Sequence, residues 1–171
     1  MIKPQIRPAR PSDIDAVAQL LARKWDITAS TVTRWLDEGP RGDDFLVLIA
    51  CQEDRLCAVG VAEDHRERRS VRITVGDRYA DVELAYLIVD RAVEGRKVGR
   101  DLQDRLLRDL ENDGHTLAAL RVEKKEIQAD GGSVGFWEKC EWTNRGDEPG
   151  TDKTILMSID LPRPTASVAI A

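Results

Sequence analysis

The stretch "AYLIVDRAVEGRKVGRDLQDRLL", residues 85–107, constrains the fold more than any other part of the chain. An apolar run ends in a charged segment with two glycines, and a leucine-rich segment follows. From residue 98 apolar side chains recur every four positions: Val98, Leu102, Leu106 and Leu110. This spacing is typical of an amphipathic helix. The stretch therefore predicts a strand, a tight loop and a helix over residues 98–113.

The loop at residues 94–100 has the features of an anion site. The first N–H groups of a helix have no partner within it, and the helix dipole is positive at that end. Arg96, Lys97 and Arg100 add three positive charges. The loop matches neither Gly-x-Gly-x-x-Gly nor Gly-x-x-x-x-Gly-Lys-Ser/Thr. By itself it is either a phosphate site or a surface connection whose glycines serve only the turn.

The remaining segments predict strands and helices in a mixed order. Strands are expected at 4–9, 44–52, 55–64, 69–75, 81–89, 116–126, near Trp142 and at 153–161, and helices at 12–25, 28–38, 98–113 and within 131–142. Hairpins followed by a strand–helix–strand crossover predict an α/β (α+β) fold with a mixed sheet, with residues 81–89 at its centre. The length of 171 residues suits one domain, predicted over residues 1–161, and residues 162–171 are predicted to be a flexible tail.

Composition and charge narrow the possible functions. A net charge of −5 does not favour binding to nucleic acid or to an anionic membrane, and no apolar run reaches transmembrane length. Cys51, Cys57 and Cys140 form no Cys-x-x-Cys pair, which predicts reduced, buried thiols in a cytoplasmic protein. His65 and His115 lie in predicted loops and make no metal-ligand spacing with the cysteines, so no metal is predicted. The charged segment 65–69 is expected to be a solvated loop.

Three segments together resemble the GNAT superfamily of acetyl-coenzyme-A-dependent N-acetyltransferases. "EGRKVG" (94–99) is similar to the family's Arg/Gln-x-x-Gly-x-Gly/Ala loop, and "FWEKCEW" (136–142) to its aromatic-Glu-Lys-Leu/Cys-Gly-Phe helix end. The opening "IRPARPSDIDAVAQLL" (6–21) is typical of the family's first strand and helix. The resemblance covers most of residues 4–161 and implies a central sheet of six to seven strands flanked by about four helices.

The resemblance also implies a site for acetyl-coenzyme A where two neighbouring parallel strands splay apart. The pantetheine arm would lie along Leu87, Ile88 and Val89, and the pyrophosphate would rest on Gly95, Arg96, Lys97, Val98, Gly99 and Arg100. Asp130 and Trp137 occupy positions that lie near the pantetheine in the family. This chain departs from the family at four positions: Glu94 for Arg or Gln, Lys97 for Gly, Asp130 for Asn and Glu141 for Gly.

Acetyl transfer to an amine needs a group that removes a proton from the ammonium. Glu83 is the candidate base, because it falls where the histone-acetyltransferase branch of the family carries its general-base glutamate. Strand alternation is expected to place it on one face with Ala85, Leu87 and Val89. A carboxylate on a buried strand is expected to have a raised pKa. The alternative is a structural Glu83 that pairs with an arginine at the sheet edge.

The group that protonates the departing thiolate is left open by the sequence. Many relatives carry Tyr at the position of Trp137, and Trp cannot give up a proton usefully. Three possibilities stay open: Tyr86 or Cys140 supplies the proton, coenzyme A leaves unaided as the thiolate, or catalysis is inefficient. A backbone amide near Val89 is the candidate donor for the oxyanion. Trp137 is expected to pack rather than react.

The leading hypothesis is an N-acetyltransferase that moves an acetyl group to a primary amine by direct attack in a ternary complex. A catalytically weak acyl-coenzyme-A-binding or regulatory module is the alternative, and a purely structural interaction domain is a third possibility. The expected partner is a small-molecule or peptide amine. Its identity stays open because residues 26–42 and 62–80, which face the substrate in such folds, carry both signs of charge. A homodimer is a weaker expectation that rests on the resemblance alone.

Overall fold

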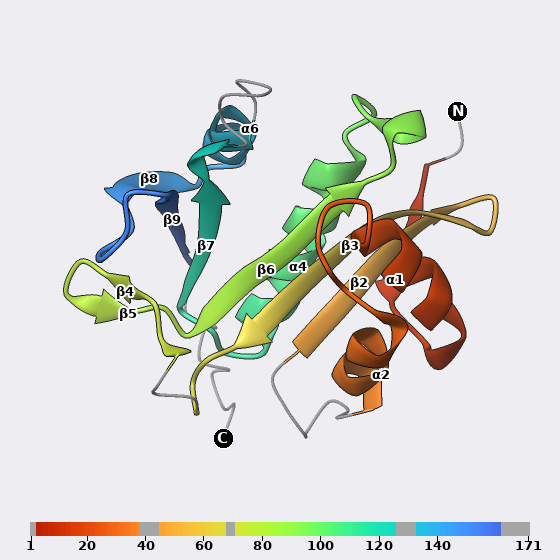
Figure 1. Cartoon of the computed structure of the whole chain (residues 1–171), viewed down its shortest axis with the longest axis horizontal. Coiled ribbons are helices and arrows are strands. Elements are labelled where there is room, and N and C mark those ends of the chain that lie inside the picture. The colour runs from red at the N-terminus through yellow and green to blue at the C-terminus, as the bar shows by residue number, and fades with distance from the viewer. Residues whose placement is uncertain (1–2, 38–44, 68–70, 126–132, 162–171) are drawn as a thin grey trace, which may run out of the picture.

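The computed structural model describes residues 3–37, 45–67, 71–125 and 133–161, and its centre is a seven-stranded sheet (Figure 1). In spatial order the strands are β1 (Gln5–Pro8), β2 (Phe45–Gln52), β3 (Arg55–Asp64), β6 (Val82–Val89), β7 (Leu117–Glu123), β9 (Thr154–Asp160) and β8 (Thr143–Asp147). Among the described strands of this sheet, β6 and β7 are the one parallel pair; the other neighbouring pairs are antiparallel. The predicted mixed sheet, with β6 at its centre, is confirmed. The predicted tail and Asp130 lie outside the described residues.

Helices cover both faces of this sheet. Among the described residues the α-helices are α1 (Ile14–Leu21), α2 (Ala29–Asp37), α4 (Val98–Asn112) and α6 (Ser133–Lys139), in agreement with the expected number. Leu48 and Ala50 of β2 join the core cluster that contains α4, whereas Val47 and Ile49 join the one that contains α1 and α2. Because both faces of β2 are covered, this strand is apolar from Phe45 to Cys51. Every helix in the described ranges is too short or too polar to cross a lipid bilayer.

Several predicted elements are shorter than expected, among them the strand predicted at 116–126, which ends at Glu123 as β7. The strand predicted at residues 69–75 is reduced to β4 (Thr74–Val75), which pairs with β5 (Arg78–Tyr79) in a separate hairpin. The prediction was wrong because β3 is already paired on both sides, by β2 and β6, so the main sheet offers no free edge there. The first helix ends at Leu21 rather than near Trp25, and a short 3₁₀ turn, η1 (Pro11–Asp13), precedes it.

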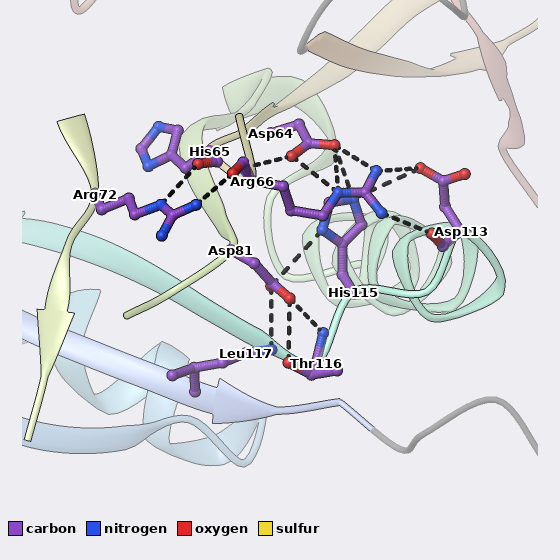
Figure 2. A network of polar contacts seen from close by, with 9 residues as sticks. All are labelled: Asp64, His65, Arg66, Arg72, Asp81, Asp113, His115, Thr116 and Leu117. Carbon is purple, nitrogen blue, oxygen red and sulfur yellow. Dashed lines mark hydrogen bonds and ion pairs between the residues drawn. The ribbon is translucent and has the colours of Figure 1, made fainter. Parts of the chain in front are cut away.

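A polar network holds the start of β6 against the start of β7 (Figure 2). The Asp81 carboxylate accepts hydrogen bonds from the Thr116 N–H at 2.9 Å, the Thr116 hydroxyl at 3.1 Å and the Leu117 N–H at 3.2 Å. The buried His115 lies beside it, with Nδ1 3.6 Å from Asp81 Oδ1 and Nε2 3.4 Å from Asp64 Oδ2. Burial raises the pKa of Asp81, but His115 and the two backbone N–H donors outweigh it and hold that pKa at about 2. This network therefore fixes one end of the β6–β7 pair.

Candidate functional site

β6 and β7 are paired only at one end. The register joins Val82 to Ala118 and Glu83 to Ala119, and no further pair joins these two strands. β6 nevertheless continues to Val89 and β7 to Glu123. The two strands thus diverge beyond Glu83, as Figure 1 shows, and the splayed parallel pair that the resemblance implied is present.

The divergence leaves one edge of β6 open. Leu87, Ile88 and Val89 pair with Gly60, Val59 and Ala58 of β3 on one side. On the other side no strand of the described residues pairs with residues 85–89. The side chains of Leu87, Ile88 and Val89 are half-buried, unlike those of Val82 and Leu84 at the closed end. An extended ligand with amide groups could hydrogen bond to this edge as a missing strand would.

The loop after β6 brings free N–H groups to this open edge. Asp90 accepts a hydrogen bond from the Ala92 N–H at the start of η3 (Arg91–Val93), and the chain then turns through Gly95, with φ 76°. Lys97 has a left-handed backbone, with φ 62°, and stands immediately before α4. The first helical hydrogen bond runs from the Asp101 N–H to the Lys97 carbonyl at 2.9 Å. The N–H groups of residues 98–100 therefore have no acceptor within the helix.

Gly99 allows the helix to approach β6 closely. A Cβ at this position would lie 3.1 Å from Cγ2 of Val89 and 3.6 Å from Cζ of Phe136 in α6. Val98 and Gly99 are buried, whereas Arg96, Lys97 and Arg100 are exposed beside them. The predicted cofactor-binding residues 87–89 and 95–100 are thus brought together at one place. An anion there would meet unpaired N–H groups, a helix N-terminus and mobile cations.

A bulge in β6 changes which residues share a face. Tyr86 lies opposite Val61 and Leu84 opposite Ala62, so Ala85 is an additional residue in β6. Consequently Leu84 and Leu87 pack in the same cluster with α4, while Tyr86 packs with α1 and α2 on the other face.

Glu83 is therefore not on the face of Leu87 and Val89. Its neighbours Val82 and Leu84 both point toward α4, so alternation directs Glu83 to the opposite face, the face of Tyr86. The prediction that Glu83, Ala85, Leu87 and Val89 share one face was wrong, because the alternation is interrupted at Ala85. The two predicted catalytic residues, Glu83 and Tyr86, lie on the same face instead.

The Glu83 carboxylate lies among charged and polar groups. Arg121 Nη1 of β7 donates to Glu83 Oε1 at 2.9 Å, and His65 Nε2 is 3.7 Å from Glu83 Oε2. Glu63 of β3 is its direct cross-strand neighbour. Burial raises the pKa of Glu83 above its ordinary value, although Arg121 and His65 act in the opposite direction. A raised pKa suits a base, and the bond to Arg121 is also the structural role that the sequence left as the alternative.

Tyr86 lies in a group of aromatic rings. Its ring centroid is 5.0 Å from that of Trp25 and 5.6 Å from that of Trp35, and Phe45 stacks on Trp35 at 5.5 Å. Burial, followed by the carboxylates of Glu83 and Glu63, raises the pKa of Tyr86. The phenol therefore stays protonated at neutral pH and has a proton to donate.

Trp137 lies between two other rings, as expected of a packing residue. Its ring centroid is 4.9 Å from the ring centroid of Phe136 and 5.6 Å from that of Trp142. The buried Trp142 Nε1 donates to Gln103 Oε1 of α4 at 2.9 Å, so α6 and the following turn are held against α4. Cys140 is buried here, and burial raises the pKa of its thiol. A thiol of raised pKa is a poor nucleophile.

Sequence reasoning missed three residues around Glu83. Glu63 and Arg121 come from different strands, and only the register of the sheet shows that they meet Glu83. His65 was expected in a solvated loop, but the residue is buried. A histidine two residues after a strand glutamate was the one available signal, since residues two apart on a strand share a face.

Similarity to known proteins is found in the structure and not in the sequence. No known family profile and no curated protein matches the sequence. The ribosomal-protein-S18-alanine N-acetyltransferase from Escherichia coli is similar in structure, with 18% identity, 96% of this chain and 98% of that chain covered and a TM-score of 0.66.

Two solved structures that contain coenzyme A are also similar. PaiA N-acetyltransferase from Thermoplasma acidophilum has 12% identity, coverage of 93% and 99% and a TM-score of 0.69. The GNAT-family N-acetyltransferase YhbS from Escherichia coli has 17% identity, coverage of 95% and 83% and a TM-score of 0.65. The chain has the GNAT N-acetyltransferase fold.

Proposed function

We propose that this chain, with its GNAT fold, transfers an acetyl group from acetyl-coenzyme A to a primary amine by direct attack in a ternary complex. One observation carries the proposal: the N–H groups of residues 98–100, which have no acceptor within α4, lie beside the open edge of β6. That arrangement suits a molecule with a diphosphate at one end and an amide-containing arm at the other. Acetyl-coenzyme A has both and supplies the thioester that reacts.

The residues of the loop fit the diphosphate. A Cβ at Gly99 would lie only 3.1 Å from Val89 Cγ2, so glycine lets the start of α4 lie close to the open edge of β6. Arg96, Lys97 and Arg100 are exposed and could reach phosphate oxygens. Glu94 is also exposed, and its negative charge repels a bound anion. The positive charge of Lys97 offsets this repulsion. Residues 87–89 would bind the pantetheine amides through their open edge, with Trp137 near the arm.

In this proposal Glu83 removes the proton from the attacking amine. Arg121 holds one carboxylate oxygen of Glu83, so the other is directed away from that ion pair. A backbone amide near Val89 would donate to the oxyanion, and Tyr86 would protonate the thiolate. The acceptor is a small-molecule or peptide amine. The cytoplasmic location and the homodimer remain predictions from the sequence.

Two measurements on the full chain test this function. Calorimetry with acetyl-coenzyme A is expected to show saturable binding, and no signal at millimolar ligand contradicts the proposal. A thiol reagent then measures coenzyme A release over a broad panel of primary amines. Release that depends on an amine supports transfer. Binding without release favours the second candidate, a weak acyl-coenzyme-A-binding module, which Trp137 in place of Tyr, together with Glu94 and Lys97, already suggests.

A further inference from the structure

We propose that Glu63, His65 and Glu83 form a binding site for a divalent transition-metal ion such as Zn²⁺. Each residue offers one ligand atom, and these three atoms lie within 4.8 Å of one another. Glu63 and His65 are two residues apart at the end of β3, and Glu83 is directly opposite Glu63 on β6. The register of the sheet therefore brings the three side chains together.

His65 is the buried polar group that indicates a ligand at this cluster. Its side chain is 2% exposed, and neither ring nitrogen has a hydrogen-bond partner among the described residues. Nε2 is 3.7 Å from Glu63 Oε2 and 3.7 Å from Glu83 Oε2. A proton on Nε2 would have no acceptor at hydrogen-bonding distance, and a lone pair there would face two carboxylates. A cation between the three atoms resolves both cases.

The two distances from His65 to the carboxylates suit a metal ion better than a water molecule. A water about 2.8 Å from each of two partners would hold them roughly 4.5 Å apart at a tetrahedral angle. Two ligand atoms bound to zinc at about 2.1 Å lie roughly 3.4 to 3.6 Å apart in tetrahedral or trigonal geometry. The two His65 distances of 3.7 Å are close to the second arrangement.

The ligand set also indicates the type of ion. One imidazole and two carboxylates favour zinc or a similar first-row metal over Mg²⁺ and Ca²⁺, which prefer oxygen ligands alone. Glu83 Oε1 is bonded to Arg121, which also bonds to Glu148 at 2.7 Å, so the carboxylate is fixed with Oε2 toward His65. Three protein ligands leave a fourth position for water or another small ligand.

The second group of similar composition does not carry this inference. Asp64, Asp113 and His115 also lie within reach of one another. Arg66, however, bonds to Asp64 Oδ2 and, at 3.2 Å, to Asp113 Oδ2, the two oxygens that face His115. Figure 2 shows how these residues lie. Arg66 therefore occupies the same oxygens that would bind an ion there, whereas Arg121 bonds to Glu83 Oε1 and leaves Oε2 toward His65.

The site overlaps the proposed base, so metal and substrate proton would compete for Glu83. A chain with zinc bound would be inactive, and chelation would restore transfer; this consequence alone rests on the proposed function. Metal binding is measured without acetyl-coenzyme A, so it succeeds or fails independently of any transferase activity.

The test uses the full chain after chelation and dialysis. Calorimetry with Zn²⁺ is expected to show that one ion binds per chain. With Co²⁺ in place of Zn²⁺, visible spectroscopy is expected to show the absorption of a four-coordinate site. Glu63→Gln and His65→Asn are each expected to weaken binding at least about tenfold. Glu67→Gln removes an exposed carboxylate two residues from His65 and is expected to bind zinc as the wild type does. No saturable binding to the wild type, or unchanged affinity in both ligand variants, overturns the proposal.

A second measurement keeps the test informative if a variant fails to fold. X-ray absorption at the zinc edge of the loaded wild-type chain is expected to show one imidazole among nitrogen and oxygen ligands. A spectrum without imidazole scattering overturns the proposal as firmly as absent binding would.

Discussion

Arg121 Nη1 donates a 2.9 Å hydrogen bond to Glu83 Oε1 across two parallel strands, at the point where their pairing stops. Glu83 is the last residue of β6 that is paired with β7, and Arg121 lies beyond the last paired residue of β7. Glu83, the proposed general base, is consequently held where the two strands begin to diverge, next to the open edge where the thioester would lie.

Glu83→Gln is expected to lower kcat by about 10²–10⁴, because the amide keeps the shape of the side chain but cannot accept the proton. The dissociation constant of acetyl-coenzyme A should change less than about twofold, since this residue is outside the anion loop. Steady-state kinetics and calorimetry measure the two quantities, and exposed Glu67→Gln is the control. An unchanged kcat would exclude Glu83 as the base.

Gly99→Glu is expected to weaken coenzyme A binding at least about tenfold. The new side chain begins 3.1 Å from Val89 Cγ2 and adds a negative charge beside the proposed phosphates. Gly99→Ala tests the steric part alone, and thermal melting of both variants separates lost binding from lost folding. Equal affinities in the wild type and a folded Gly99→Glu variant would move the phosphate site elsewhere.

Lys97→Gly separates backbone conformation from charge. Lys97 has φ 62°, a conformation that costs a residue with a side chain about 1–2 kcal/mol relative to glycine, so the variant should be more stable to urea by up to that amount. Coenzyme A affinity should nevertheless fall severalfold at low salt, with the difference shrinking as salt is added. A variant that binds more tightly would mean that Lys97 obstructs the site.

Asp81→Ala is expected to reduce the free energy of unfolding by about 2–3 kcal/mol. The change leaves the Thr116 and Leu117 N–H groups without their carboxylate acceptor at the closed end of β6 and β7. Chemical denaturation measures the loss. Asp77→Ala, at an exposed position of the β4–β5 turn, is the matched control, and a loss of equal size there would argue against this role.

Asp13 is expected to contribute stability that depends on pH. Its carboxylate accepts two hydrogen bonds from Arg7, at 2.7 and 2.9 Å, and one from the Arg10 N–H at 2.7 Å. The hydrogen bond from Arg7 is the main cause that lowers the pKa of Asp13. The folded state therefore favours the ionised form of Asp13. The stability that Asp13 contributes is present above its pKa in the unfolded chain, about 3.9, and is lost as the pH falls through its pKa in the folded chain.

Asp13→Asn should accordingly cost about 1–2 kcal/mol of unfolding free energy at pH 7 and much less at pH 3. Denaturation at both pH values measures this difference, with exposed Asp15→Asn as the control. A cost that does not change with pH would show that charge is not the source of the stability.

Much of the architecture could be predicted because it depends on local patterns. Helix α4 follows from leucines spaced by four, and β6 from a continuous apolar run. The loop between them could be recognised from its glycines and cations, since the chemistry of a helix N-terminus does not depend on distant residues. These elements were predicted to within a residue or two of their observed ends.

The surroundings of Glu83 could not be predicted in the same way. One additional residue at Ala85 reverses the face of everything that follows it, and nothing in the composition of β6 marks a bulge. The contacts of Glu83 with Glu63 and Arg121 depend on how three strands are aligned, which alternation along a single strand does not reveal.

The open edge of β6 also has a consequence for solubility. An unpaired strand edge can recruit an extended segment of another chain, which is a common route to aggregation. Here the vulnerable edge is interior to the sheet and is the same one to which the pantetheine amides are proposed to bind. A ligand in that position would act as a surrogate strand, and a preparation kept saturated with coenzyme A should therefore resist aggregation longer than one stripped of it.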